Sequence, residues 1–223
     1  MNAKEDTPDP DPDPDPDRTV RPVRRRLGAD ERRAALLEAA RAAFRTRAYT
    51  EVSVAEIAHA AGASEALAHR YFGSKSALYA AMVTDGLREL LARDAACDAD
   101  PGPEPDGWAR LRASLRVYLG FIAEGANGWA TLLRAPGSVP PEALAERDRG
   151  RAVFHERVTT RLGLDAGDPA VRLVVDGYLA YVDNACLRWW EAGCPEELRS
   201  PLVESAVGAL TGALAALSPV PEP

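Results

Sequence analysis

Residues 53–82 read SVAEIAHAAGASEALAHRYFGSKSALYAAM, and this stretch decides the expected fold. Ser53 and Glu56 have the spacing of an S-x-x-E capping box, in which each side chain satisfies a free backbone N–H at a helix start. The apolar residues that follow repeat at helical spacing. Gly62 can take a positive φ without strain, so it is suited to end this helix.

Two more helix starts follow directly after this glycine. Ser64 is the expected N-cap of a short helix that ends near Tyr71, and Ser74 is the expected N-cap of a longer one. Two short helices joined by a tight glycine turn are the parts of a helix-turn-helix unit. Helix pairs with glycine turns are also common in proteins that bind no DNA, so the spacing alone leaves both interpretations open.

The rest of the chain has helical periodicity and no sustained alternation of apolar and polar residues, which predicts an all-α fold without a sheet. A first helix is expected from Asp30, as its N-cap, to Arg47. The segment Asp100–Gly107 is rich in Pro, Gly and Asp and is expected to be a loop. Further helices are expected at about 107–124, 127–135, 140–163, 169–192 and 196–217, which makes about nine in all.

Charge is distributed unevenly along the chain. The net charge is −7, yet residues 18–92 hold thirteen basic and eight acidic side chains, between two acidic segments. A basic segment of this kind is an electrostatic footprint for nucleic acid. Residues 8–17 read PDPDPDPDPD and cannot form a packed core. We therefore expect a disordered tail at 1–23 and a helix-turn-helix DNA-binding domain at 24–78, followed by a second helical domain at 79–223.

Other features of the sequence argue against an enzyme or a membrane protein. The three cysteines are scattered without metal-ligand spacing, and there is no glycine-rich phosphate loop or nucleophile motif. The longest run of small and apolar residues, Val207–Leu217, is shorter than the roughly 20 residues that a membrane span needs. We expect a cytoplasmic protein with reduced cysteines, no catalytic residues, no metal site and no cofactor.

The string between Ser53 and Met82 resembles the DNA-binding domain of the tetracycline-repressor (TetR) family of transcriptional regulators. The resemblance covers about residues 30–85 and rests on Ile57–Ala58, Ala61–Gly62, Ser64, Tyr71–Phe72, Lys75 and Leu78. It implies a homodimer that binds an inverted-repeat operator in double-stranded DNA, in most cases as a repressor, and that a small effector releases. The chain departs from the family pattern at Glu65, Ala66–Leu67 and His69, so the family's base preferences do not transfer.

Residues of the expected DNA contact come from the basic arm and the helix-turn-helix. They are Arg24, Arg25, Arg26, Ser53, Ser64, Glu65, His69, Arg70, Tyr71 and Lys75. Arg70 and Tyr71 lie on the second short helix, and Lys75 is placed to hold a phosphate at a helix N-terminus. The Glu65 carboxylate either accepts a hydrogen bond from a cytosine amino group or only stabilises the helix N-terminus electrostatically. The arginines of the arm either enter a minor groove or form a solvated run, and His69 either packs or contacts bases.

The resemblance implies that residues 79–223 form an effector-binding and dimerisation domain, so an effector pocket is expected among their helices. Its candidate lining mixes aromatic surface with a few polar groups and consists of Tyr118, Phe121, Trp129, Phe154, His155, Tyr178 and Asn184. Such a lining suits a small apolar or aromatic compound, although each residue could equally be ordinary core. The two last expected helices carry wide apolar stripes, which favours pairing with their copies in a four-helix dimer bundle. The alternative function is a helical adaptor that binds a small molecule or a protein but no DNA.

Overall fold

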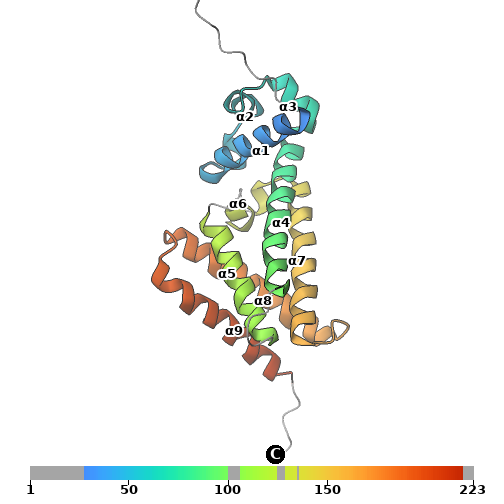
Figure 1. The fold of residues 1–223 in the computed structure, drawn as a ribbon, viewed down its shortest axis with the longest axis vertical. Coiled ribbons are helices and arrows are strands. Elements are labelled where there is room, and N and C mark those ends of the chain that lie inside the picture. The colour runs from blue at the N-terminus through green and yellow to red at the C-terminus, as the bar shows by residue number, and fades with distance from the viewer. Residues whose placement is uncertain (1–27, 100–105, 125–128, 135, 218–223) are drawn as a thin grey trace, which may run out of the picture.

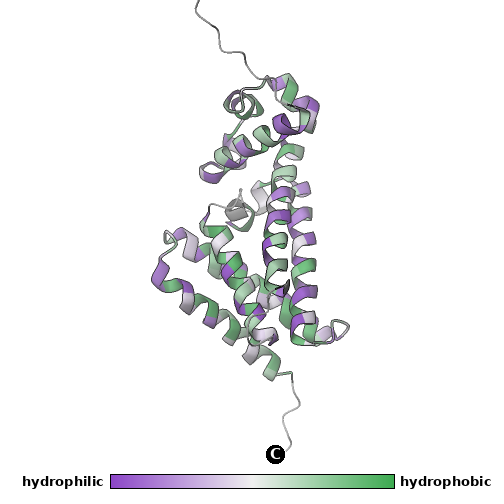
Figure 2. Cartoon of the chain, in the orientation of Figure 1, coloured by the Kyte–Doolittle hydropathy of each residue, from purple (hydrophilic) through white to green (hydrophobic). Residues whose placement is uncertain are grey.

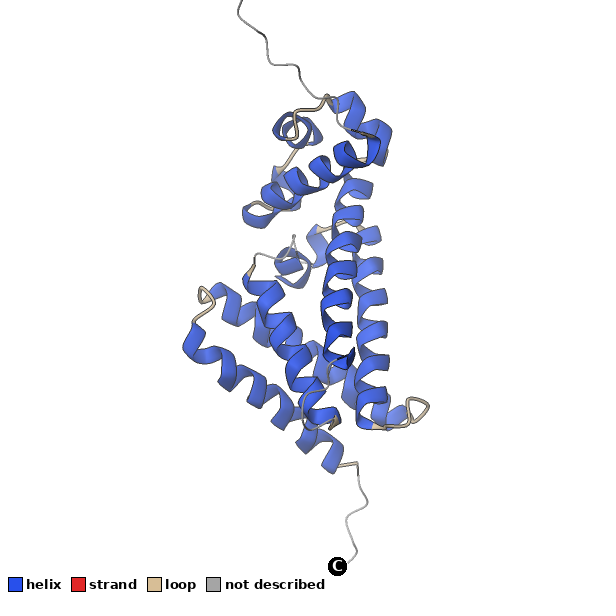
Figure 3. Cartoon of the chain, viewed as in Figure 1, coloured by secondary structure: helices blue, strands red, loops and turns tan. Residues whose placement is uncertain are grey.

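The computed structural model describes residues 28–99, 106–124, 129–134 and 136–217. These ranges contain nine α-helices and no strand (Figure 3). The helices are α1 Ala29–Thr46, α2 Val54–Ala60, α3 Glu65–Phe72, α4 Lys75–Ala99, α5 Gly107–Ala123, α6 Trp129–Arg134, α7 Pro141–Leu162, α8 Pro169–Glu191 and α9 Arg199–Ala215. Short 3₁₀ turns occur at Tyr49–Glu51, Pro136–Ser138 and Glu196–Leu198. The prediction of an all-α fold with about nine helices is confirmed, whereas the expected tail at 1–23 lies outside the described residues.

Two helix starts differ from the sequence prediction. Asp30 is not the N-cap of α1, because Gly28 takes that position and donates its backbone N–H to the Glu31 carboxylate at 2.8 Å. Asp30 lies in the first turn, where a negative charge favours the helix dipole. The last predicted helix is divided into a 3₁₀ turn and α9, which places Pro201 in the first turn of α9, where its missing N–H costs no helical hydrogen bond.

The molecule is elongated, with α1, α2 and α3 forming a head at one end (Figure 1). The long helix α4 begins in the head and continues into the body, where it packs against α5 and α7. The helices α8 and α9 pack against each other and against α5 on the other side of the body. The predicted domain boundary at 78/79 therefore falls inside a continuous helix. Within the described ranges, no helix is long and apolar enough to cross a membrane.

An aromatic cluster attaches the head to α4. The rings of Phe44 in α1 and Tyr79 in α4 meet edge to face at 4.8 Å, and the Tyr49 ring lies 5.2 Å from that of Tyr79. Phe44 and Tyr79 are almost completely buried. A fully buried side chain of this size contributes about 1.5–3 kcal/mol to folding. The ion pair between Arg41 of α1 and Asp85 of α4 adds a polar contact across the same junction. The hydropathy colours show the apolar residues on the inward faces of these helices (Figure 2).

The helices α4 and α7 approach each other closely at a glycine. A Cβ atom placed on Gly150 of α7 would lie 2.7 Å from Cδ1 of Leu87 in α4, so no larger residue fits without displacing that leucine. The N-terminus of α5 makes a similar approach, because a Cβ on Gly107 would lie 1.9 Å from the carbonyl oxygen of Arg161. At these two glycines, the backbones of α7 and α5 therefore lie directly against residues of the neighbouring helices.

A buried carboxylate lies where α4, α5 and α7 meet. The Asp94 side chain is only 1% exposed and accepts hydrogen bonds from Arg157 and Arg161 of α7 and from the Ser114 hydroxyl of α5. Arg161 lies 2.8 Å from Asp94 and bridges onward to Asp98 at 2.9 Å. Burial alone would raise the pKa of Asp94, but the hydrogen bonds from Arg161, Ser114 and Arg157 outweigh it and hold the pKa below its usual range.

Replacement of Asp94 by alanine should lower the free energy of unfolding by about 3–5 kcal/mol, because it leaves two arginines without their buried partner. Urea unfolding measures this loss. The control is Glu204→Ala, which removes the exposed partner of Arg112 and should cost less than about 1 kcal/mol. Equal, small losses in both variants would show that the Asp94 cluster does not hold the body together.

Candidate nucleic-acid interface and ligand pocket

The helices α2 and α3 form the predicted helix-turn-helix. The Ser53 hydroxyl accepts the Glu56 N–H at 3.1 Å, and the Glu56 carboxylate accepts the Ser53 N–H at 2.8 Å, which completes the capping box. Gly62 has φ +65° in the turn, and Ser64 caps α3 by accepting the Leu67 N–H at 3.2 Å. Only glycine takes this φ at no cost, so the turn angle between the two helices depends on it.

The helix α3 is anchored to the head mainly through a small residue. Leu67 is only partly buried, whereas its neighbour Ala68 is 1% exposed. Ala58 and Ile57 of α2 are buried as well. A small residue at position 68 lets α3 lie close to α2, with its polar face outward.

The outward face of α3 carries Glu65, His69 and Arg70, all exposed. His69 Nδ1 lies 3.1 Å from the Gly73 carbonyl oxygen, and its Nε2 lies 3.7 Å from Glu65. The contact with Gly73 ties one ring nitrogen of His69 to the end of its own helix, whereas Nε2 and the Glu65 carboxylate stay exposed to solvent. Arg70 makes no hydrogen bond or ion pair with the described residues, so its guanidinium is available for an outside partner.

Lys75 occupies the first turn of α4, next to α3. Its Nζ lies 4.3 Å from the centre of the Tyr49 ring, and partial burial lowers the pKa of its ammonium group. The contact holds the side chain at the head surface. Tyr71 is half-buried beside Phe72, with ring centres 6.4 Å apart. The predicted contact residues 64–75 thus lie on one short segment of the head, and Ser53 caps the neighbouring helix.

Sequence reasoning missed Arg33. This exposed arginine of α1 lies over the Phe72 ring, 5.3 Å from its centre, and so adds a cation beside the C-terminus of α3. Arg33 belongs to the basic segment found in the sequence, but only the folded head brings it next to Phe72. The predicted arm residues Arg24, Arg25 and Arg26 lie outside the described residues.

The excess of positive charge in residues 18–92 comes from the segment before the head. Residues 28–92 carry eight basic and eight acidic side chains, so they are neutral overall. Several of their cations are paired as well, among them Arg41 with Asp85 and Arg47 with Glu56. The five surplus positive charges of residues 18–92 therefore belong to the arginines at 18–26.

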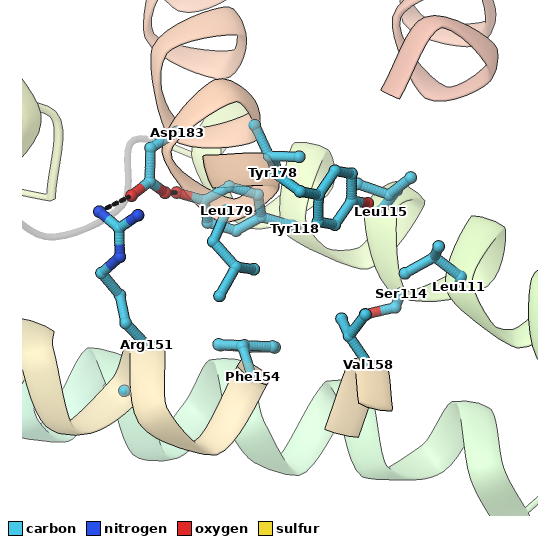
Figure 4. Close-up of a pocket in the computed structure, with 12 residues that line it drawn as sticks. Leu111, Ser114, Leu115, Tyr118, Arg151, Phe154, Val158, Tyr178, Leu179 and Asp183 are labelled. Carbon is cyan, nitrogen blue, oxygen red and sulfur yellow. Dashed lines mark hydrogen bonds and ion pairs between the residues drawn. The ribbon is translucent and has the colours of Figure 1, made fainter. Parts of the chain in front are cut away.

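The body contains a pocket between α5, α7 and α8, shown in Figure 4. It is open to solvent on one side, and its empty space, counted together with that opening, is about 560 Å³. Its walls are mostly apolar. They consist of Leu111, Ser114, Leu115, Tyr118, Gly150, Arg151, Phe154, Val158, Tyr178, Leu179, Val182 and Asp183.

Three of the predicted ligand-binding residues line this pocket, namely Tyr118, Phe154 and Tyr178. Phe121, His155 and Asn184 do not line it. Asn184 is exposed, Phe121 is buried elsewhere in the core, and the His155 Nε2 lies 3.9 Å from Asp176. Neighbouring residues of a helix point about 100° apart, so Asn184 faces away although Asp183 faces the pocket. Trp129 is in α6, but its side chain lies outside the described part.

Sequence reasoning also missed the polar side chains at the edge of the pocket. Asp183 of α8 accepts the Tyr118 hydroxyl at 2.9 Å and pairs with Arg151 of α7 at 3.2 Å (Figure 4). Burial raises the pKa of Asp183 above its usual range, against the opposing effects of Tyr118 and Arg151. One signal in the sequence could have indicated this site: Asp183 stands within an apolar helix stripe. An acidic residue in such a place is seldom buried without a partner.

A helix-turn-helix head joined by one continuous helix to a helical body with a pocket defines the class of helix-turn-helix transcriptional regulators. Two family models match the chain: "Bacterial regulatory proteins, tetR family" over residues 36–82, and "Tetracyclin repressor-like, C-terminal domain" over residues 108–209. The chain belongs to the TetR family of transcriptional regulators.

Individual relatives agree with this assignment. The chain is 29% identical over 175 residues to the HTH-type transcriptional activator FasR of Mycolicibacterium smegmatis, covering 74% of each chain. A TetR-family regulator from Streptomyces coelicolor has a similar structure, with a TM-score of 0.71, 26% identity and 85% of each chain covered. FadR of Bacillus subtilis, solved with stearoyl-CoA, shares the fold alone at 14% identity, with a TM-score of 0.66 over 79% of this chain and 98% of that one. These relatives are regulators rather than enzymes.

Replacement of Tyr118 by phenylalanine should make the stability of the protein more dependent on pH. The folded-state pKa of Asp183 is raised, so stability falls as pH rises from about 4 through that pKa. Loss of the Tyr118 hydrogen bond raises the pKa of Asp183 further and deepens this fall. At neutral pH the variant should be about 1–2 kcal/mol less stable than the parent protein, with the difference shrinking toward pH 4.

Urea unfolding at several pH values measures this difference. Tyr181→Phe is the control, because the Tyr181 hydroxyl contacts Ser205 and not a carboxylate. Its effect on stability should be the same at every pH. A Tyr118→Phe effect that is equally independent of pH would contradict the assigned role.

Proposed function

We propose that the protein is an effector-controlled transcriptional repressor that binds an inverted-repeat operator as a homodimer and is released by a small apolar or aromatic compound. The observation that carries this proposal is the continuous helix α4, which begins beside the exposed face of α3 and ends beside the wall of the pocket. A ligand in the body can act on DNA binding only if it favours a conformation in which the two heads no longer match the half-sites.

Contacts between the pocket wall and α4 give a physical route for this coupling. Ser114 lines the pocket and donates its hydroxyl hydrogen to Asp94 of α4. Gly150 also lines the pocket and lies against Leu87 of α4. A ligand that moves α5 or α7 must therefore displace α4 or break these contacts. Because α4 continues into the head, its displacement changes the position of α3.

The contacts with DNA are proposed from exposure and charge. Arg70 is the free cation of α3 among the described residues and would contact bases, with Tyr71 beside it. Lys75 and the caps Ser53 and Ser64 would hold phosphates near helix N-termini. The contact of His69 with the Gly73 carbonyl favours a role for His69 in positioning the end of α3 over a role in reading bases.

Selection of DNA fragments by the purified protein should recover an inverted repeat with half-site centres about 34–36 Å apart, or multiples of one turn. Arg70→Ala should cost about 1–3 kcal/mol of binding free energy and relax the preference at one position of each half-site. Fluorescence anisotropy with the selected DNA measures both effects. Arg149→Ala, which changes an exposed arginine of the body, is the control and should bind like the parent protein. Selection without an inverted repeat would refute the proposal.

The dimer face is proposed on the outward sides of α8 and α9. The apolar stripe predicted for this purpose, including Val175 and Leu210, is instead buried inside the single subunit. The outward side includes Leu173, which is 74% exposed, and the small residues Gly177, Gly208 and Gly212. A Cβ on any of these glycines would meet nothing within 4 Å. Glycines on the outside of two packed helices leave room for the backbones of a second copy.

Gly208→Glu should therefore yield monomers that remain folded, because the added side chain is tolerated within the subunit but places a charge in the dimer face. Gly208→Ala is the conservative control and should stay dimeric. Light scattering measures the mass and circular dichroism the melting temperature. Leu210→Glu, by contrast, should unfold the subunit, since Leu210 is 0% exposed. If Gly208→Glu still forms a folded dimer, the dimer interface lies elsewhere on the protein.

A further inference from the structure

The hydroxyl of Tyr178 is a buried polar group without a protein partner. Tyr178 is only 6% exposed, and its hydroxyl oxygen forms no hydrogen bond with the described residues. The residue belongs to the pocket wall, and its ring extends from α8 toward Leu115 of α5 (Figure 4). Buried polar groups in folded proteins nearly always have a partner, so an exception in the wall of a cavity points to a ligand atom.

The other polar side chains of the pocket already have partners within the protein. The Asp183 carboxylate is held by Tyr118 and Arg151, and the Ser114 hydroxyl is bonded to Asp94. The charges of Arg151 and Asp183 neutralise each other. Among the described wall residues, the Tyr178 hydroxyl is the buried side-chain group that has no partner.

The surroundings of this hydroxyl also restrict the ligand. The wall around it is formed mainly by aliphatic and aromatic side chains, including Leu111, Leu115 and Val158. An ionised ligand group buried here would lose its hydration without gaining an opposite charge, which is unfavourable. Burial raises the pKa of Tyr178 well above its usual value, so the phenol keeps its proton at neutral pH and acts as a donor.

We propose that the effector is an uncharged, mainly apolar molecule with one carbonyl or hydroxyl oxygen that accepts a hydrogen bond from Tyr178. This inference rests on the proposed function, in which the pocket is the effector site, and it specifies the chemical class of that effector. The apolar body fills the space between α5, α7 and α8, and the single oxygen fixes its orientation. An aliphatic ketone, an aromatic ketone or an alcohol of suitable size shares this chemistry.

The test uses prodan, an uncharged naphthyl ketone whose emission responds to hydrogen bonding at its carbonyl. Prodan should bind the full-length protein saturably, and Tyr178→Phe should weaken this binding about tenfold, as expected for one lost hydrogen bond. The propyl analogue of prodan, which lacks the carbonyl, should bind both proteins equally. Tyr181→Phe removes a hydroxyl from the same helix outside the pocket and should leave prodan affinity unchanged.

A second measurement separates ligand binding from a structural role of the hydroxyl. Without ligand, Tyr178→Phe should melt at the same temperature as the parent protein or higher, because the change removes a buried polar atom that has no partner. A hydroxyl that stabilises the fold would give a lower melting temperature. Any of three results would overturn the inference. They are a lower melting temperature of Tyr178→Phe, equal prodan affinity in both proteins, and no saturable prodan binding at all.

Failure of the inference can be told apart from failure of the proposed function. Binding of the parent protein to its selected DNA is measured with and without saturating prodan. If prodan binding depends on Tyr178 but DNA affinity does not change, the ligand class stands and control of DNA binding by this pocket is refuted. If DNA is released but Tyr178→Phe binds prodan as the parent does, effector control stands and the contact with Tyr178 is refuted.

Discussion

The carboxylate of Asp94 has almost no access to water, and the body depends on how this charge is satisfied. Two arginines of α7 and one serine of α5 converge on it, so three helices must be in place at once. An ionised group buried without partners would cost several kcal/mol. This requirement fixes the register of α7 against α4, and the close contact of Gly150 with Leu87 repeats the constraint at a second point.

The same helix α4 serves the head, which explains how one chain can combine a DNA-binding surface with a pocket. Tyr79 and Asp85 of α4 hold α1 through an aromatic cluster and an ion pair. Further along, Asp94 receives the hydroxyl of Ser114, a residue of the pocket wall. The pocket wall and the head therefore both contact the same helix, α4.

Local features of the head were predictable from the sequence because the interacting groups lie within a few residues of each other. The capping box of Ser53 and Glu56 and the positive φ of Gly62 are of this kind. The pocket was predicted only in part, since its walls come from three helices whose rotation the sequence does not specify. Asp183 and Asn184 are adjacent, yet one faces the pocket and the other solvent.

By itself the sequence determined the helical class, the helix-turn-helix and its family, because periodicity, caps and glycine turns are short-range properties. The tertiary structure alone decided which apolar stripe is core and which sides of α8 and α9 stay exposed. It also decided that Asp183 meets Arg151 and that the hydroxyl of Tyr178 finds no hydrogen-bond partner among the described residues. These outcomes depend on how helices far apart in the chain rotate and pack, and that is set by the sum of many weak contacts.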